Sequence, residues 1–169
     1  MLLSYRIDCA NIMQGMEKMI MTVLTHLKTV FTTLGLTPPQ HQNRPFDRRQ
    51  KRFAPCPASP NCVSTQAPSE DKVHYMAPIP YIGSATPIHK RLLRIIEAMP
   101  RCTVTINTPD YMRAEFRSQL FHFVDDVEFY LDEMQQIIHF RSAARSGRSD
   151  LGVNRRRMKT IWQRLGEEE

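Results

Sequence analysis

Hydrophobic and polar residues alternate strictly along residues 121–131, and this period of two predicts a β-strand. One face of the strand would carry Phe121, Phe123, Asp125, Val127, Phe129 and Leu131. The other face would carry His122, Val124, Asp126, Glu128 and Tyr130. A buried carboxylate must be paired, hydrogen-bonded or neutral. We therefore expect Asp125 to be either a structural anchor or part of a site.

The same period of two recurs before and after this strand. In residues 102–107 the apolar set is Cys102, Val104 and Ile106, and in residues 111–118 it is Met112, Ala114 and Phe116. Residues 136–143 carry Ile138 and Phe140 as their apolar set. Because the connections between these segments are short, they predict an antiparallel β-meander of about four strands with one apolar face.

Helical spacing appears on both sides of the meander. The first helix would begin at Thr86 as its cap, with Pro87 in the first position, and end before Pro100. Its apolar face would consist of Ile88, Leu92, Ile95, Ile96 and Met99. In the last helix, Ser149 or Asp150 would form the cap or a preceding turn. Its buried side would consist of Leu151, Met158, Ile161, Trp162 and Leu165. The predicted fold class is α+β, a meander flanked by a preceding and a following helix.

The whole chain is predicted to divide into three segments. Residues 1–36 form an amphipathic helical extension, because apolar residues recur every three or four positions from residue 13 to 34. His26 and Lys28 interrupt this pattern, which falls short of the roughly 20 apolar residues that a membrane span requires. Membrane-surface binding, packing against a protein and a disordered leader stay open. Residues 37–53 are predicted as a linker and residues 54–169 as a single domain.

Prolines and two cysteines mark residues 54–82, which predicts an extended arm over the domain. The spacing between Cys56 and Cys62 differs from that of zinc knuckles and thioredoxin-like redox pairs, so we predict no metal site and no cofactor. A disulfide or two free thiols in a tight turn stay open. A nucleophilic Cys62 with His74 as its base is a further possibility from residue type alone.

Length and composition narrow the class of protein. A chain of 169 residues with 41% hydrophobic residues is long enough for one domain with a core. The net charge of +6 permits attraction to nucleic acid or an anionic membrane, but the basic runs at residues 48–52 and 155–157 lack interleaved aromatic residues, which disfavours nucleic-acid binding. The first residues show no signal-peptide pattern. We expect a cytoplasmic or peripheral membrane protein.

The polar face of the meander is the candidate ligand-binding site, together with the start of the last helix. A solvated sheet face is the simpler interpretation of its mixed charges. The functional interpretation is a groove for a small polar or anionic ligand, or a protein partner. The candidate binding residues are Arg113, Glu115, Arg117, Asp126, Glu128, His139, Arg141, Arg145, Ser149, Asp150 and Arg155. We assign structural roles to Asp125, Cys56 and Cys62.

Two functions follow from these residues. The first is a non-catalytic ligand-binding or scaffold module, with peripheral membrane contact through residues 13–34 as one option. The alternative is a small hydrolase or isomerase that uses Asp125, Asp126 or Glu128 as acid or base. The chain has no nucleophile elbow and no glycine-rich phosphate loop, so whether it is an enzyme stays undecided.

Three strings of residues carry a resemblance to a known family. They are Cys56-Pro-Ala-Ser-Pro-Asn-Cys-Val-Ser64, the stretch from Phe116-Arg-Ser to Tyr130-Leu131, and the stretch from Arg141-Ser-Ala-Ala-Arg to Asn154-Arg-Arg-Arg157. From about residue 53 to 165 the chain resembles the bacterial and plastid family of domain of unknown function 1499 (DUF1499). The resemblance implies that the domain begins at the proline and cysteine arm. It implies no activity, substrate or cofactor.

Overall fold

The computed structural model describes residues 15, 18–23, 26, 46–119 and 123–167, in two compact units, residues 1–38 and 39–169. In the first unit, residues 15, 18–23 and 26 are helical, and the apolar residues there that are more than half exposed are Met19, Ile20, Met21 and Val23. Among the described residues, no helix is long and apolar enough to cross a membrane. Most of the apolar pattern over residues 13–34 lies outside the described residues.

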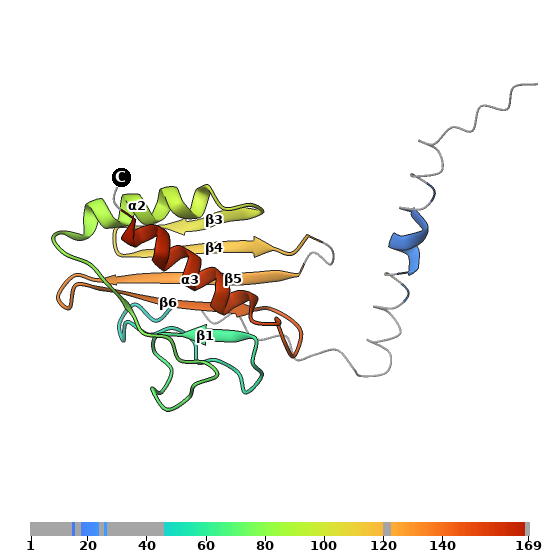
Figure 1. The fold of residues 1–169 in the computed structure, drawn as a ribbon, viewed down its shortest axis with the longest axis horizontal. Coiled ribbons are helices and arrows are strands. Elements are labelled where there is room, and N and C mark those ends of the chain that lie inside the picture. Colours follow the sequence, from blue (N-terminus) through green and yellow to red (C-terminus); the bar gives the residue numbers. More distant parts are fainter. Residues whose placement is uncertain (1–14, 16–17, 24–25, 27–45, 120–122, 168–169) are drawn as a thin grey trace, which may run out of the picture. The chain divides into compact units, whose positions relative to one another are not determined.

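The second unit is built on a six-stranded sheet (Figure 1). Its strands are β1 (Cys62–Ser64), β2 (Ile79–Pro80), β3 (Cys102–Asn107), β4 (Tyr111–Arg117), β5 (Val124–Asp132) and β6 (Ile137–Ala144). Their order is β1-β6-β5-β4-β3, with β2 also paired to β6, and every pairing is antiparallel. The predicted meander is therefore confirmed as β3 to β6. Residues 54–82, which were predicted to be extended, add β1 and β2 along β6.

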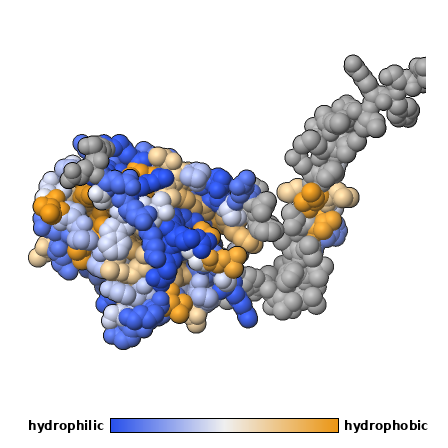
Figure 2. All heavy atoms as spheres, viewed as in Figure 1, coloured by the Kyte–Doolittle hydropathy of each residue, from blue (hydrophilic) through white to orange (hydrophobic). Residues whose placement is uncertain are grey.

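Two helices, α2 (Ala85–Glu97) and α3 (Val153–Gly166), cover one face of the sheet (Figure 1). The core between the layers includes Leu92, Ile96, Met112, Val127, Phe129, Ile138, Phe140, Met158 and Ile161, all completely buried. From the helix side, the surface of the domain is mostly hydrophilic with scattered apolar residues (Figure 2). The apolar faces of both helices thus point into the core, and the α+β class is confirmed.

Two aromatic or aliphatic residues do not take the places that strict alternation predicts. β5 begins at Val124, so Phe123 lies before the strand and is 49% exposed, while Phe121 and His122 are outside the described residues. In β3 an irregularity between Val104 and Ile106 adds one residue, and Ile106 lies opposite Arg113. A β-bulge shifts the alternation by one position. Ile106 consequently points to the polar face, which corrects its predicted inward position.

The helix ends also differ from the prediction. Ser84, and not Thr86, precedes the first helical residue of α2, and its side chain makes no capping bond. At α3 the N-cap is Gly152, whose φ of 76° suits a residue without a Cβ. The predicted turn before this helix is confirmed, because the side chains of Ser149 and Asp150 accept hydrogen bonds from the backbone N–H groups of residues 151, 152 and 154. Leu151 lies before α3 and is 83% exposed, because the chain has not yet entered the helix there. Trp162 is 40% exposed, since it neighbours Ile161 on the helix and therefore points about 100° away from the core.

Candidate functional site

The sheet face opposite the helices carries polar side chains in rows across β4, β5 and β6. Antiparallel register aligns these rows as Tyr111–Tyr130–His139, Arg113–Glu128–Arg141 and Glu115–Asp126–Ala143. Directly opposed residues in a sheet lie close enough for their side chains to interact. The predicted polar face therefore exists, but Asp126, Glu128 and Arg141 in its centre are buried. The charges alternate in sign along the row Arg113–Glu128–Arg141, whereas Glu115 and Asp126 place two carboxylates opposite each other.

Asp126 is the centre of one charge cluster on this face. Its carboxylate is 3% exposed and accepts hydrogen bonds from Arg113 Nη2 at 2.9 Å and from Arg145 Nε and Nη2, both at 2.7 Å. Arg145 also bonds Glu115. Burial by itself raises the pKa of Asp126, but the hydrogen bonds from Arg145 and Arg113 outweigh it and lower this pKa below its ordinary value. The small side chain of Ala143, opposite Asp126, leaves room for the guanidinium of Arg145.

Glu128 forms a second, more deeply buried cluster. It is 1% exposed, accepts a hydrogen bond from the hydroxyl of Tyr111 at 2.7 Å and faces Arg141 Nη1 at 3.5 Å. Burial raises the pKa of Glu128, and the hydrogen bond from Tyr111 opposes this rise only in part. Within the described part of the chain, the buried Nε atoms of Arg113 and Arg141 have no hydrogen-bond partner.

An aromatic cluster covers one end of the polar face. Phe46 stacks on Tyr111 with 4.7 Å between ring centroids, and it also contacts Phe53 and Tyr130. These four residues form a small core separate from the main one. Residues 46–53, which composition assigned to the linker, are therefore packed against the sheet. We call residues 46–58 the arm.

Asp125 points to the opposite face, toward α3. Its carboxylate accepts a hydrogen bond from Arg157 Nη2 at 2.7 Å. Burial raises the pKa of Asp125, and the positive charge of Arg157 opposes this rise. Arg157 also donates to the side chains of Ser142 and Asn154, and Asn154 donates to the carbonyl of Asn61 at 3.2 Å. This polar network joins Asn61, which precedes β1, to the sheet and α3. The role of Asp125 as a structural anchor stays a prediction.

Asn61, Ser142 and Asn154 are completely buried, and none of them was among the predicted site residues. Asn61 also donates to the carbonyl of Gly147 at 2.6 Å. Buried amide side chains need partners for both their oxygen and nitrogen atoms. Each of the three strings that carry the family resemblance supplies residues to this network. A signal was available in Asn154, which lies four residues before Met158 and thus on the buried face of its helix.

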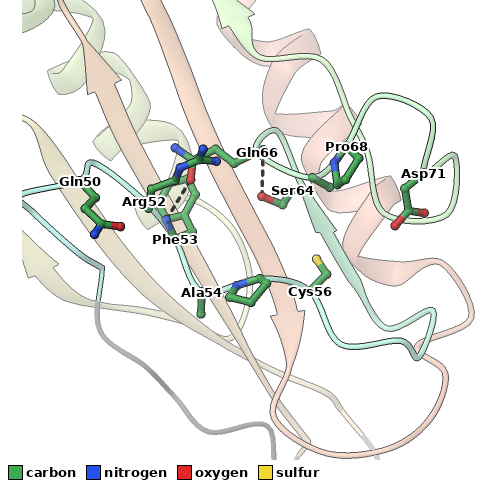
Figure 3. Close-up of a pocket in the computed structure, with 11 residues that line it drawn as sticks. Gln50, Arg52, Phe53, Ala54, Cys56, Ser64, Gln66, Pro68 and Asp71 are labelled. Carbon is green, nitrogen blue, oxygen red and sulfur yellow. Dashed lines mark hydrogen bonds between the residues drawn. The ribbon is translucent and has the colours of Figure 1, made fainter.

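A cavity of about 350 Å³ lies at the β1 edge of the polar face, between the arm and the loop after β1. Its lining consists of Gln50, Arg52, Phe53, Ala54, Pro55, Cys56, Ser64, Gln66, Ala67, Pro68 and Asp71. Figure 3 shows Ala54 and Cys56 on one side and Ser64, Gln66, Pro68 and Asp71 on the other. Gln66 connects the two walls, because its Oε1 accepts from Phe53 N–H at 2.9 Å and its Nε2 donates to the Lys51 carbonyl at 2.8 Å.

The two charged residues in this lining, Arg52 and Asp71, differ in whether their side chains already have hydrogen-bond partners. Asp71 accepts a hydrogen bond from His74 Nδ1 at 2.6 Å and others from the backbone N–H groups of Val73 and His74. The hydrogen bond from His74 lowers the pKa of Asp71. Within the described residues, the guanidinium of Arg52 makes no hydrogen bond and no ion pair. The cavity therefore has an available positive charge and an occupied negative one.

The remaining candidate residues have partners within the domain. Arg117 pairs with Glu115 at 3.2 Å, and His139 shares a hydrogen bond with Thr65 at 3.0 Å. Asp150 accepts from the N–H of Asn154 at 2.8 Å, so the chain's own carboxylate occupies the N-terminus of α3. Arg155 binds the backbone carbonyls of residues 72, 73 and 75. None of the eleven predicted binding residues lines the cavity. Their binding role stays a prediction.

Cys56 of the arm and Cys62 of β1 form a disulfide, with 2.04 Å between their sulfur atoms. This decides between the disulfide and the free thiols. It also means that Cys62 has no free sulfur to serve as the nucleophile beside His74. Cys102 is a free thiol whose pKa is raised to about 11 by burial, which disfavours the reactive thiolate. No group of three metal-ligating side chains gathers anywhere in the described residues.

Comparison with known proteins gives one match. The family model described as "Protein of unknown function (DUF1499)" matches residues 52–165. The match thus includes Arg52, all six strands and nearly all of α3, up to Leu165. No curated protein and no solved structure matches the chain.

Proposed function

The chain belongs to the DUF1499 family, and we propose that its domain is a non-catalytic module that binds a small anionic ligand in the cavity between the arm and the loop after β1. One observation carries the proposal: Arg52 brings an available positive charge to a cavity of about 350 Å³. That volume lies within the range of small-molecule sites. We place the ligand there because the charges of the polar face are largely occupied by one another.

The lining indicates the chemical class of the ligand. A guanidinium group binds carboxylate and phosphate groups through two parallel hydrogen bonds. The side-chain amide of Gln50 and the hydroxyl of Ser64 lie in the same lining and can donate further bonds. Phe53, Pro55 and Pro68 supply apolar surface for the rest of the molecule. We therefore favour a small organic acid or phosphate ester with a compact apolar part.

The carboxylates of β5 favour binding over catalysis. A general acid or base must reach the proton that it transfers. Asp126 and Glu128 are almost completely buried, and Asp125 is held by Arg157 on the helix side of the sheet. None of the three belongs to the lining of the cavity. The acid/base enzyme is accordingly the weaker of the two functions.

The test compares Arg52→Ala with Arg49→Ala. Both substitutions remove one positive charge from the same segment, but only Arg52 lines the cavity. Inorganic phosphate and a panel of small carboxylates and phosphate monoesters would be titrated into the ¹⁵N-labelled full chain and followed by amide chemical shifts. We expect the amides of Arg52, Ser64 and Gln66 to move. Loss of a charge-assisted hydrogen bond should weaken binding about tenfold or more in Arg52→Ala.

Arg49→Ala should stay within about twofold of the wild type, because exposed charges away from a site contribute little. Equal weakening in both variants would mean that only the general positive field attracts the probes. Absence of shifts with every probe would refute the proposed site. Native mass spectrometry of the freshly purified protein would add an independent reading, since a bound small acid would appear as a mass increment lost in Arg52→Ala.

We also propose that residues 13–34 make peripheral membrane contact. The support is the set of exposed apolar side chains Met19, Ile20, Met21 and Val23 on a helical segment. The full chain should then pellet with liposomes that contain anionic lipid, and a chain that lacks residues 1–36 should not. A full chain that stays in the supernatant would end this proposal.

A further inference from the structure

The Cys56–Cys62 disulfide fastens the arm to the edge of the sheet at the cavity. Cys62 belongs to β1, is 2% exposed and lies opposite Ala143. Cys56 belongs to the arm, is only partly buried and forms part of the cavity lining. Figure 3 shows the sulfur of Cys56 directed away from Ala54 and toward the strand that carries Ser64. One sulfur is therefore fixed in the core, and the other holds a cavity wall.

The other attachments of the arm lie on either side of this bond. On the N-terminal side, Phe53 N–H donates to Gln66 Oε1 at 2.9 Å, and Phe53 is part of the aromatic cluster. On the C-terminal side, the hydroxyl of Ser59 donates to Asn61 Oδ1 at 2.9 Å, and the Ser59 carbonyl meets the ring of His74 at 3.1 Å. These contacts fix both ends of residues 54–58.

Residues 54–58 themselves have few attachments. Within the described chain, no hydrogen bond or ion pair holds any of these five residues, so the disulfide is their one cross-link. Pro55 and Pro57 have no backbone N–H with which to form another. Ala54, Pro55 and Cys56 nevertheless line the cavity. One wall of the cavity thus depends on a single covalent bond.

We propose that the Cys56–Cys62 disulfide is a redox gate, which fixes residues 54–58 as a cavity wall when oxidised and releases them when a dithiol reductant cleaves it. This inference rests on the proposed function only for its effect on ligand binding. Its effect on the wall itself is independent of any ligand.

The chemistry is ordinary thiol–disulfide exchange. One thiolate of the reductant attacks Sγ of Cys56, which is the less buried of the two residues, and forms a mixed disulfide. Cys62 leaves as a thiolate and takes up a proton. The second thiol of the reductant then acts as a thiolate and attacks the reductant sulfur that is bonded to Cys56. Cys56 leaves as a thiolate and takes up a proton. The reductant becomes a cyclic disulfide, and the protein gains two electrons and two protons as two thiols.

The test uses the full chain with Cys9→Ser and Cys102→Ser, so that any effect of a reductant arises at the disulfide. Backbone ¹⁵N relaxation would be measured before and after addition of dithiothreitol. We expect the order parameters of the Cys56 and Ala58 amides to fall from about 0.85 to below about 0.6. The Phe53 amide, which is held by Gln66, should stay rigid and serves as the internal control.

Ligand binding is measured with the probe that causes the largest amide shifts in the titrations that compare Arg52→Ala with the wild type. Its dissociation constant should rise at least fivefold on reduction, and Cys56→Ser/Cys62→Ser should behave like the reduced protein without any reductant. Unchanged shifts of core amides such as those of Phe129 and Ile161 show that the domain has stayed folded.

The two proposals fail in different ways. If the oxidised protein binds no probe, the proposed function fails, and the relaxation data still decide whether the disulfide fixes the wall. If the order parameters of Cys56 and Ala58 do not change on reduction, the gate is refuted. Equal affinity of the oxidised and reduced forms likewise refutes it, even when the wall loosens. If reduction or the double substitution unfolds the domain, the bond is a general structural element, and the gate is again refuted.

Discussion

Replacement of Asp126 by asparagine gives the sharpest test of what holds the polar face together. The substitution keeps the shape of the side chain but removes the negative charge that Arg113 and Arg145 share. The amide keeps one oxygen as an acceptor and directs an NH₂ group toward guanidinium donors. The donors of Arg113 and Arg145 then have fewer acceptor atoms, and water has little access because residue 126 is only 3% exposed.

The expected loss of stability depends on how deeply the arginine partners of Asp126 are buried. Loss of one member of a fully buried ion pair destabilises a protein by about 3–5 kcal/mol. Here the side chain of Arg145 is 35% exposed and keeps Glu115 as a partner, so water and Glu115 recover part of the loss. The side chain of Arg113 is only 16% exposed and has less relief. We expect Asp126→Asn to lower the free energy of unfolding by about 2–3 kcal/mol at pH 7.

Urea unfolding followed by the fluorescence of Trp162 measures this loss, and Asp110→Asn is the matched control. Asp110 pairs with Arg48 at 3.4 Å, with side chains that are 50% and 54% exposed. An exposed pair of this kind contributes less than about 1 kcal/mol. If the two variants lose the same stability, or Asp126→Asn loses less than about 0.5 kcal/mol, the cluster does not hold the face together as we argue.

The pH dependence of the same pair adds a second criterion. The pKa of Asp126 is lowered in the folded state from an ordinary value of 3.8. A carboxyl group with a lowered folded pKa contributes stability above its unfolded pKa, and this contribution disappears as the pH falls through the folded pKa. The difference between wild type and Asp126→Asn should therefore be complete at pH 7 and shrink below about pH 4. A difference that is constant down to the lowest pH at which the protein folds would contradict the pairing.

Two further predictions concern residues with a structural role. Asp125→Asn should lower the melting temperature while the fold is kept, because Arg157 loses its countercharge at a site buried against α3; an unchanged melting curve would argue against burial of this pair. Thiol titration of the denatured, unreduced protein should detect two free thiols among its four cysteines, because Cys56 and Cys62 are bonded to each other. Detection of four would contradict the disulfide.

The sequence was sufficient to predict the elements in which a single period repeats without interruption. In β4, alternation places Met112, Ala114 and Phe116 inward, and all three are buried. The same rule correctly separates the neighbours Asp125 and Asp126 onto opposite faces of β5. A period of two assigns each residue to a face directly, so no information from distant residues is needed.

Features that depend on one extra residue or on long-range contacts could not be predicted in this way. The bulge in β3 reverses the side of Ile106 without any mark in the alternation of the preceding residues. Phe46 and Phe53 are isolated aromatic residues in a basic segment, and only their contact with Tyr111 and Tyr130 shows that the segment is packed. The cavity depends on the bond between Phe53 and Gln66, which are 13 positions apart.

The same reasoning explains why the candidate binding surface and the cavity are different places. A pattern of alternating charges on a sheet face indicates which residues are neighbours, but only distances show which charges are already occupied. On the polar face, Asp126 and Glu128 each have arginine partners. In the basic run of the arm, Arg48 lies over the ring of Tyr111 and Lys51 over that of Tyr130, so these two cations help to hold the arm on the sheet.

Arg52 belongs to the same basic run but lines the cavity, without a partner among the described residues. Arg52 is exposed at the cavity, so its guanidinium is accessible from solvent. The arm therefore combines two tasks that composition alone describes as one solvated linker. Its aromatic residues and two of its cations pack against the end of the polar face. The position of Arg52 next to Phe53 places its guanidinium at the cavity, where we propose that an anion binds.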